Sequence, residues 1–167
     1  CMKKFLLLFS GLTFFLASGQ DKDSLITKVI LVRHAEKAND GTKNPSLSEE
    51  GQNRAKRLSA MLKDVVINQA YSTPYKRTTE TLTPLCEAKN IEMKSYDARN
   101  ITLIEEIIKN DKGKTIVIAG HSNTIPNLIN QLIKEEKYSE IDEDNYGKMW
   151  ILTFKNNLLI DTTLLNY

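Results

Sequence analysis

Two short runs of aliphatic and β-branched residues constrain the fold of this chain most. Residues 28–32 read Lys-Val-Ile-Leu-Val, and residues 115–119 read Thr-Ile-Val-Ile-Ala. Continuous apolar runs of this length are typical of strands that are buried on both faces of a parallel sheet. The chain has two histidines, and each follows one of these runs: His34 the first and His121 the second. Because ligands bind at the carboxyl ends of strands in such sheets, we expect the two histidines to share one site.

Segments with helical spacing alternate with segments that are typical of strands. Four helices are expected: one that Ser48 caps, one around Leu82, Leu85 and Cys86, one at Ile104–Ile108 and one at Ile125–Ile133. Pro84 is expected to bend or break the second of these helices. Further strands are expected at 69–72, 91–96, 149–154 and 158–164. This order predicts an α/β fold with three layers, α/β/α, a mainly parallel sheet and a C-terminal antiparallel hairpin at its edge.

Residues 2–19 differ in kind from the rest of the chain. Lys3 and Lys4 precede an apolar run that ends at the small residues Ala17-Ser18-Gly19, which is the order of a secretory signal peptide. The apolar run has about 13 residues, fewer than the roughly 20 that span a bilayer, so an uncleaved anchor is the weaker alternative. We therefore expect export to the periplasm or the extracellular space, a single domain over residues 24–167, and no stable membrane association after cleavage.

Net charge and cysteine count give no indication of a nucleic-acid partner and exclude a disulfide within the exported domain. Loss of Lys3 and Lys4 with the leader would bring the formal net charge from +2 to zero, so nothing indicates a nucleic-acid partner. Cys86 would be the single cysteine of the exported domain, which allows no disulfide within the chain, and its apolar setting predicts a buried thiol. The sequence does not indicate an oligomeric state.

The neighbours of the histidines favour an anion over a metal ion. Two histidines without a second cysteine or a paired histidine spacing are a weak ligand set for zinc. Arg33 stands beside His34, where a fixed positive charge would oppose a metal cation but suit a phosphoryl group. Arg77 follows a third expected strand end at the start of a helix, a position that also favours anions.

Four sequence elements together resemble the histidine phosphatase superfamily, which includes the phosphoglycerate mutases. Residues 31–36, Leu-Val-Arg-His-Ala-Glu, are similar to its Arg-His-Gly signature, and residues 47–51 are similar to its Leu-Thr-x-x-Gly helix start. Residues 72–81 resemble its Ser-x-x-x-x-Arg-Thr-x-x-Thr element, and residues 120–122 its second-histidine element. The elements occur in the order of the family, and the small size of the chain resembles its uncapped branch.

The resemblance implies a role for each matching residue. His34 would attack phosphorus, while Arg33, Arg77 and His121 would bind the phosphoryl oxygens, and Asn39 would add a further phosphate contact. Phosphoryl transfer needs an in-line nucleophile and stabilisation of charge on the equatorial oxygens, so we expect neither a metal nor another cofactor. A nucleophilic imidazole must be neutral, and the neighbouring arginines are expected to lower its pKa.

The proton donor to the leaving group is less clearly marked. Asp97 follows the strand expected at 91–96 and is our choice for the general acid among the catalytic residues. Glu36, Glu105 and Glu106 are alternatives, although carboxylates on an exposed helix face are usually only solvated.

These features predict a metal-independent phosphatase that hydrolyses a small phosphomonoester through a phosphohistidine on His34. A mutase would need a lid that excludes water, and only 43 residues separate Arg77 from His121. A phosphohistidine protein phosphatase, a phosphoglycerate mutase-type phosphotransferase and a noncatalytic phosphate-binding module are the alternatives.

Overall fold

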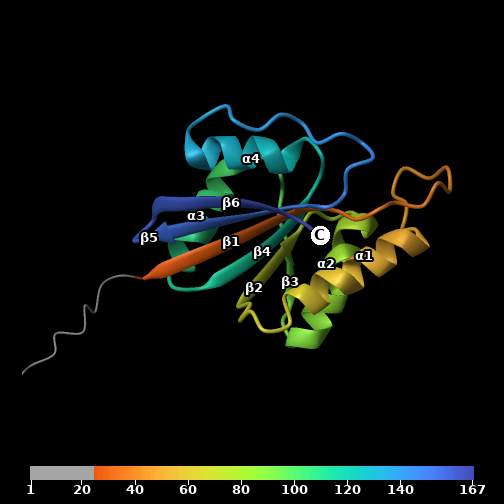
Figure 1. Ribbon diagram of the computed structural model, residues 1–167, viewed down its shortest axis with the longest axis horizontal. Helices are drawn as coiled ribbons and strands as arrows, with labels where there is room; N and C mark the ends of the chain where they lie inside the picture. The colour runs from red at the N-terminus through yellow and green to blue at the C-terminus, as the bar shows by residue number, and fades with distance from the viewer. Residues whose placement is uncertain (1–24) are drawn as a thin grey trace, which may run out of the picture.

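Six strands form one mixed sheet in a computed structural model that describes residues 25–167 (Figure 1). The expected leader at residues 2–19 lies outside the described residues. The order of strands across the sheet is β3-β2-β4-β1-β5-β6. The four parallel strands are β1 (Ile26–Arg33), β2 (Gln69–Ser72), β3 (Met93–Ser95) and β4 (Thr115–Gly120). The antiparallel strands β5 (Lys148–Lys155) and β6 (Leu158–Asn166) complete one edge.

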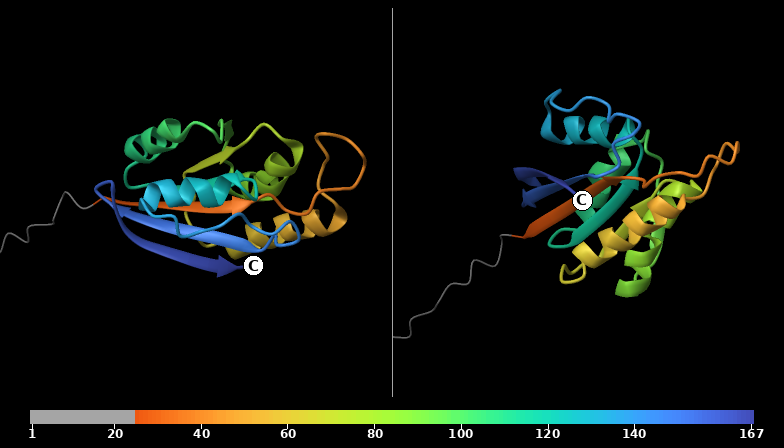
Figure 2. Two further views of the ribbon diagram at one scale, coloured as in Figure 1. Left: turned by 90° about the horizontal axis from the view of Figure 1, so that it is seen from above. Right: turned by 45° about the vertical axis from the view of Figure 1, so that its right-hand side comes forward.

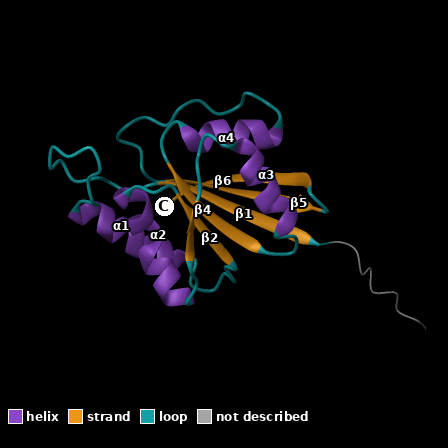
Figure 3. Ribbon diagram, turned by 180° about the vertical axis from the view of Figure 1, so that it is seen from behind, coloured by secondary structure: helices purple, strands orange, loops and turns teal. Residues whose placement is uncertain are grey.

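The helices cover the sheet on both faces. Helices α1 (Glu49–Met61) and α2 (Lys76–Lys89) pack together on one face, and α3 (Ile101–Asn110) and α4 (Thr124–Ile133) lie on the other (Figures 2 and 3). Alternate side chains of β1 therefore enter two different hydrophobic clusters, one on each side of the sheet. The three-layer α/β/α fold with an antiparallel edge hairpin is confirmed.

The start of α1 is determined by two residues of the Leu-Ser-x-x-Gly element. Ser48 caps the helix, since its hydroxyl accepts a hydrogen bond from the Gly51 amide at 3.1 Å. Gly51 packs against the main chain of Glu36, and a Cβ added at Gly51 would lie 2.1 Å from the Glu36 carbonyl oxygen. Glycine thus lets the first turn of α1 lie directly against the segment that follows His34.

Two details of the expected elements differ in the structure. Helix α2 does not break at Pro84 but continues to Lys89. The cost of a proline in a helix is outweighed by packing, because Leu82, Leu85 and Cys86 are all buried against the sheet. Strand β3 is also shorter than the expected 91–96, since only Met93–Ser95 pairs with β2.

The C-terminal hairpin turns at Asn156 and Asn157, which both have positive φ, 51° and 69°. This is the conformation that two-residue hairpin turns require and that asparagine tolerates. Among the described residues, no helix has the length and apolar character needed to cross a membrane.

The parallel strands end in step at one edge of the sheet. Arg33 at the end of β1 is paired with Gly120 at the end of β4, and Ser72 at the end of β2 is aligned with Ala119 and Ser95. The segments that follow these strands therefore meet at the carboxyl edge, where the sequence predicts the site.

Candidate active site

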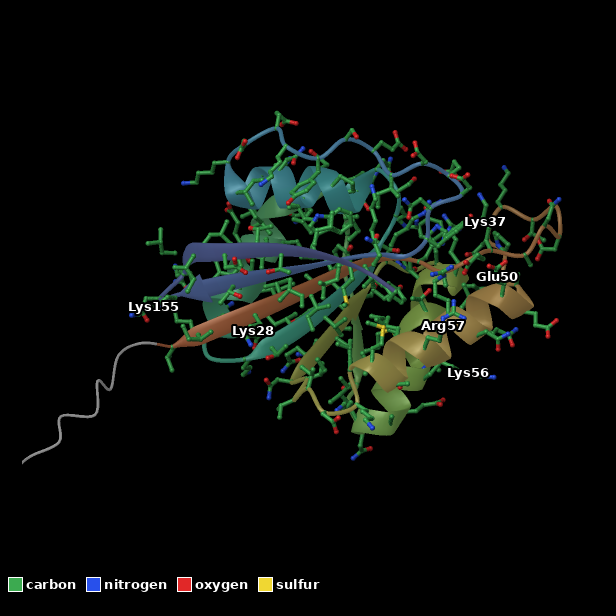
Figure 4. All side chains as sticks on the ribbon, viewed as in Figure 1. Lys28, Lys37, Glu50, Lys56, Arg57 and Lys155 are labelled. Carbon is green, nitrogen blue, oxygen red and sulfur yellow. The ribbon has the colours of Figure 1, made fainter. Side chains whose placement is uncertain are left out.

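An open cleft of about 910 Å³ lies at the carboxyl edge of the parallel strands. Its walls come from the segments that follow β1, β2, β3 and β4 and from the loop that leads to β5. Figure 4 places Lys37, one of the lining residues, at this end of the molecule, opposite Lys28 and Lys155. Besides Lys37, the residues that line the cleft include His34, Thr73, Tyr75, Arg77, Asp97, Arg99, His121, Ser122 and Glu143.

His34 lies at the base of this cleft, immediately after β1, and is almost fully buried. Its Nδ1 lies 2.7 Å from the Ala35 carbonyl oxygen. A carbonyl oxygen only accepts, so Nδ1 carries the ring proton and Nε2 keeps its lone pair. Burial lowers the pKa of His34 to about 3, and the positive charge of Arg77 adds to this effect, against the opposing effect of the hydrogen bond to Ala35.

His121 faces His34 across the cleft, with the two ring centroids 5.4 Å apart in an edge-to-face arrangement. It follows β4 in the way that His34 follows β1. Burial lowers the pKa of His121 to about 4, with a further contribution from the positive charges of Arg77 and Arg33. Both imidazoles are therefore neutral at neutral pH.

Arg77 lies in the first turn of α2 and lines the cleft beside His121. Its Nη2 is 3.4 Å from Nδ1 of His121, and its guanidinium lies 4.6 Å from the centre of the Tyr75 ring. The Tyr75 ring also contacts His121 edge-on at 5.1 Å. Tyr75 thus supports both side chains, and the structure brings together three of the predicted residues: His34, Arg77 and His121.

Arg33 is placed differently from the sequence expectation. Its guanidinium is buried and donates hydrogen bonds of 2.7, 3.0 and 2.9 Å to the carbonyl oxygens of Asp142, Glu143 and Asn145. It also lies 4.1 Å from the centre of the Tyr146 ring. Arg33 does not line the cleft, so the phosphate contact expected for it is not part of this arrangement. Its positive charge still contributes to the low pKa of both histidines.

Asp97 lines the cleft at its rim, but its surroundings do not support the expected role of general acid. The exposed carboxylate accepts hydrogen bonds from the side chain and amide of Arg99, and these bonds lower its pKa. An acid that donates a proton near neutral pH needs a raised pKa instead. At neutral pH Asp97 is a carboxylate paired with Arg99.

The other expected polar residues lie apart from the cleft. Asn39 is exposed and does not line it, so the structure does not bring this residue to the phosphate position. Glu36 forms a two-oxygen ion pair with Arg54, with distances of 2.6 to 3.0 Å. Glu105 and Glu106 are exposed on α3. None of these carboxylates lines the cleft.

Sequence reasoning missed several residues that shape the site. The hydroxyl of Thr73 lies 3.0 Å from Nε2 of His121, and Thr73 is itself almost fully buried. Ser122 donates a hydrogen bond to Glu143, whose carboxylate also lies 3.5 Å from Arg33. The residue Glu143 belongs to the loop before β5, and no local pattern in the sequence links that loop to the histidines.

The last threonine of the 72–81 element has a role that the structure makes visible. Thr81 on α2 accepts a hydrogen bond from the Ala35 amide at 2.9 Å and donates one to the Arg77 carbonyl oxygen at 2.6 Å. Its hydroxyl therefore joins the segment after His34 to the helix that carries Arg77. Ala35 itself is fully buried.

Within residues 25–167, no three histidine, cysteine, aspartate or glutamate side chains are grouped so as to hold a metal ion. The groups that meet in the cleft are two neutral imidazoles and a guanidinium, which suit an anionic ligand with several oxygens.

The first part of this site lies in a range of the sequence that matches a known family. Residues 29–99 match the profile of the histidine phosphatase superfamily (branch 1), a range that holds His34 and Arg77 and stops before His121. The chain is also 40% identical over 78 residues to phosphoserine phosphatase 1 of Hydrogenobacter thermophilus. That alignment covers 43% of this chain and 37% of the relative, so the chain spans a little over a third of the length of this relative.

Solved structures share the fold at low sequence identity. A phosphoserine phosphatase of Entamoeba histolytica, in complex with phosphoserine, has a TM-score of 0.68 and 17% identity, covering 83% of this chain and 96% of its own. The protein histidine phosphatase SixA, complexed with tungstate, has a TM-score of 0.68 and 15% identity over the same shares. A phosphoglycerate mutase of Bacillus anthracis has a TM-score of 0.66 and 15% identity, covering 87% and 94%. The profile match and the shared fold together confirm the resemblance of this chain to the histidine phosphatase superfamily.

Proposed function

We propose that this chain is a phosphatase that hydrolyses a phosphomonoester through a covalent phosphohistidine on His34. The observation that carries the proposal is the state of the His34 ring. Its Nδ1 proton is held by the Ala35 carbonyl oxygen, its Nε2 lone pair is free, and its pKa is lowered to about 3. A neutral imidazole with a free lone pair, in a cleft that also holds the guanidinium of Arg77, is what nucleophilic attack on phosphorus needs.

In the first step of the proposed reaction, Nε2 of His34 bonds to phosphorus as the ester P–O bond breaks. Arg77 and His121 are the cleft residues placed to stabilise the charge on the equatorial oxygens. The leaving oxygen takes its proton from water that enters the cleft, since Asp97 is ionised and paired with Arg99. In the second step, water attacks phosphorus as the P–N bond breaks and returns its electron pair to Nε2, and the proton that this water releases neutralises the hydroxide left by the first step. The products are inorganic phosphate and neutral His34.

Two features support hydrolysis over transfer to a second substrate. The cleft is open, so water can reach a phosphoryl group on His34. The segment between Arg77 and His121 contains the rest of α2, then β3, α3 and β4, which leaves no long insertion to close the site. No metal has a step in this scheme, since the positive charge comes from the protein.

The substrate class is a phosphomonoester with a small or exposed phosphate group. The similar proteins named above include phosphoserine phosphatases and a protein histidine phosphatase, which suggest two sources for such a group, a small phosphorylated molecule or a phosphorylated protein. The rim carries charges of both signs, from Lys37 and Arg99 and from Asp97 and Glu143. This rim favours a small substrate that carries both a positive and a negative charge in addition to its phosphate, because each charge can pair with an opposite one.

The test is hydrolysis of p-nitrophenyl phosphate in the presence of a chelator, followed by phosphoserine, 3-phosphoglycerate and a phosphohistidine peptide. We expect turnover by the wild-type chain and a loss of at least about 1,000-fold in kcat for His34→Ala. An acid-labile phosphate should be trapped on His34 during turnover. The variant Lys43→Ala, at an exposed position outside the cleft, is the control and should keep full activity.

Two results would contradict the proposal. Wild-type activity in His34→Ala would exclude His34 as the nucleophile. Binding of inorganic phosphate without turnover on any of the four substrates would instead favour a phosphate-binding module.

A further inference from the structure

Thr73, Thr78, Arg77 and His121 form a hydrogen-bonded chain that determines where the proton of the His121 ring lies. The Thr73 hydroxyl lies 3.0 Å from Nε2 of His121 and 2.9 Å from the hydroxyl of Thr78. Arg77 lies at the other side of the ring, with Nη2 3.4 Å from Nδ1. The positions of the heavy atoms allow the hydrogen bonds to run from His121 toward Thr78 or from Thr78 toward His121. The groups at the two ends, Arg77 and Thr78, decide between these directions.

The Arg77 end requires an acceptor on the ring. A guanidinium has five N–H donors and no acceptor. If Nδ1 of His121 carried the ring proton, two donors would face each other in a part-buried place. This contact favours a lone pair on Nδ1 of His121 and, in a neutral ring, the proton on Nε2.

The Thr78 end leads to the same assignment by a separate route. The Thr78 hydroxyl lies 2.8 Å from the Tyr75 carbonyl oxygen and 2.9 Å from that of Thr73, and both oxygens only accept. Its single proton goes to these carbonyls, so the Thr78 oxygen is free to accept a proton from the hydroxyl of Thr73. The Thr73 oxygen can then accept the N–H of the His121 ring.

The two histidines consequently have opposite tautomers. His34 carries its proton on Nδ1, toward the Ala35 carbonyl oxygen, and His121 carries its proton on Nε2, toward Thr73. Burial keeps both rings neutral, and the pKa of His121 is lowered to about 4. Nδ1 of His121 is the atom that lies beside Arg77, where the phosphoryl oxygens of the proposed reaction are stabilised.

We propose that Thr73 is a positioning residue that accepts the Nε2–H of His121 and so keeps the Nδ1 lone pair of that ring toward Arg77 and the cleft. The role of Thr73 in turnover rests on the proposed function, whereas the tautomer of His121 does not. The Thr73 oxygen accepts the same N–H whether the ring is neutral or has taken up a proton on Nδ1. His121 can therefore become a donor to a bound phosphoryl oxygen without turning its ring.

The tautomers can be read directly, because His34 and His121 are the two histidines of the chain. The full chain is labelled with ¹⁵N-histidine, and two-bond ¹H–¹⁵N correlation spectra are recorded at neutral pH. His34→Gln assigns the two sets of ring signals by removing one of them. We expect a protonated Nε2 and an unprotonated Nδ1 for His121, and the reverse for His34.

Three threonine variants separate the role of the hydroxyl from that of its packing. Thr73→Val removes the shorter of the two ring contacts, at 3.0 Å, and leaves the 3.4 Å contact to Arg77, so His121 should become a mixture of tautomers. The kcat/KM on p-nitrophenyl phosphate should fall by about 10-fold or more, since the Nε2–H of the ring loses its acceptor. Thr73→Ser should restore the tautomer. Thr79→Val is the matched control, because the Thr79 hydroxyl bonds only to carbonyl oxygens of its own helix, and it should change neither quantity.

The ring of His34 serves as the internal check that Thr73→Val is folded, since its Nδ1–H tautomer should persist. A wild-type His121 with its proton on Nδ1 would overturn the proposal, and so would an unchanged tautomer in folded Thr73→Val. If the chain hydrolyses none of the substrates, the proposed function fails while the spectra still decide the tautomer. If turnover is found but the tautomer is the opposite one, only the role of Thr73 fails.

Discussion

At the scale of single residues, burial is the main cause of the chemistry in the cleft. His34 is 4% exposed, and an imidazolium placed there would lose most of its hydration. The pKa of His34 therefore falls to about 3 and that of His121 to about 4. The same loss of hydration that keeps the His34 ring neutral makes the folded state sensitive to acid.

This sensitivity gives a prediction for stability. The ordinary pKa of histidine is 6.5, and the folded value for His34 is about 3, so between these pH values the unfolded chain binds a proton that the folded chain does not. The free energy of unfolding should therefore fall as the pH falls below 6.5, by about 1.4 kcal/mol per pH unit for each such histidine. Urea unfolding of wild type and His34→Gln from pH 7 to pH 4.5 measures the slope.

We expect the slope of His34→Gln to be smaller than that of wild type, because one of the two buried imidazoles is gone. The carboxylates titrate alike in both proteins, so the difference between the two curves isolates the histidine. Parallel curves would mean that His34 has an ordinary pKa.

At the scale of elements, the site is positioned by contacts that helices α1 and α2 make with the segment after β1. Thr81 of α2 holds the Ala35 amide, and Gly51 of α1 lies against the Glu36 main chain. Both contacts act on the segment that directly follows His34. The position of His34 thus depends on how closely α1 and α2 approach this segment.

Gly51→Ala tests this dependence. The added Cβ would meet the Glu36 carbonyl oxygen at 2.1 Å, and because that oxygen belongs to the main chain, the start of α1 or the segment after His34 must move. We expect the free energy of unfolding to fall by about 1–3 kcal/mol, as for other overpacked sites. Chemical denaturation measures it, with Gln52→Ala at the next, exposed position of α1 as the control. Equal stability of both variants would show that the contact is loose.

At the scale of the whole molecule, one arginine joins three distant parts of the chain. Arg54 of α1 forms the two-oxygen ion pair with Glu36 and also donates to the main-chain oxygen of Tyr167 at 2.6 Å. The side chains of Arg54 and Glu36 are only 15% and 12% exposed. Burial alone would raise the pKa of Glu36, but the hydrogen bonds from Arg54 outweigh this effect and lower it.

Arg54→Gln should therefore destabilise the fold. The substitution leaves the Glu36 carboxylate largely buried without its cation, which we expect to cost about 1–3 kcal/mol in the free energy of unfolding. Lys56→Gln is the matched control, since Lys56 is a cation that lies exposed on the same helix (Figure 4). The loss should shrink at low pH, where Glu36 is protonated in both proteins. A loss that is the same for both variants would contradict the role of this ion pair.

Much of this architecture follows from local sequence patterns. The two buried central strands, the helix capped by Ser48 and the hairpin at Asn156 and Asn157 each have a signal of a few residues, because burial and turn geometry act on neighbours in the chain. The continuation of α2 through Pro84 without a break has no such local signal. Its interior proline opposes helix formation locally, and only packing against the sheet and α1 stabilises it.

By itself, the sequence determined the α/β fold and the placement of His34, Arg77 and His121 at the ends of parallel strands, since strand ends and helix starts are local properties. Only the tertiary structure decided that the Arg33 side chain donates to the loop before β5 and that Asp97 pairs with Arg99. The inferred position of the proton on each histidine ring also depends on tertiary contacts. Each depends on which donor or acceptor lies within about 3 Å in space, the range over which hydrogen bonds act. For Arg33 those acceptors are carbonyl oxygens more than 100 residues away along the chain.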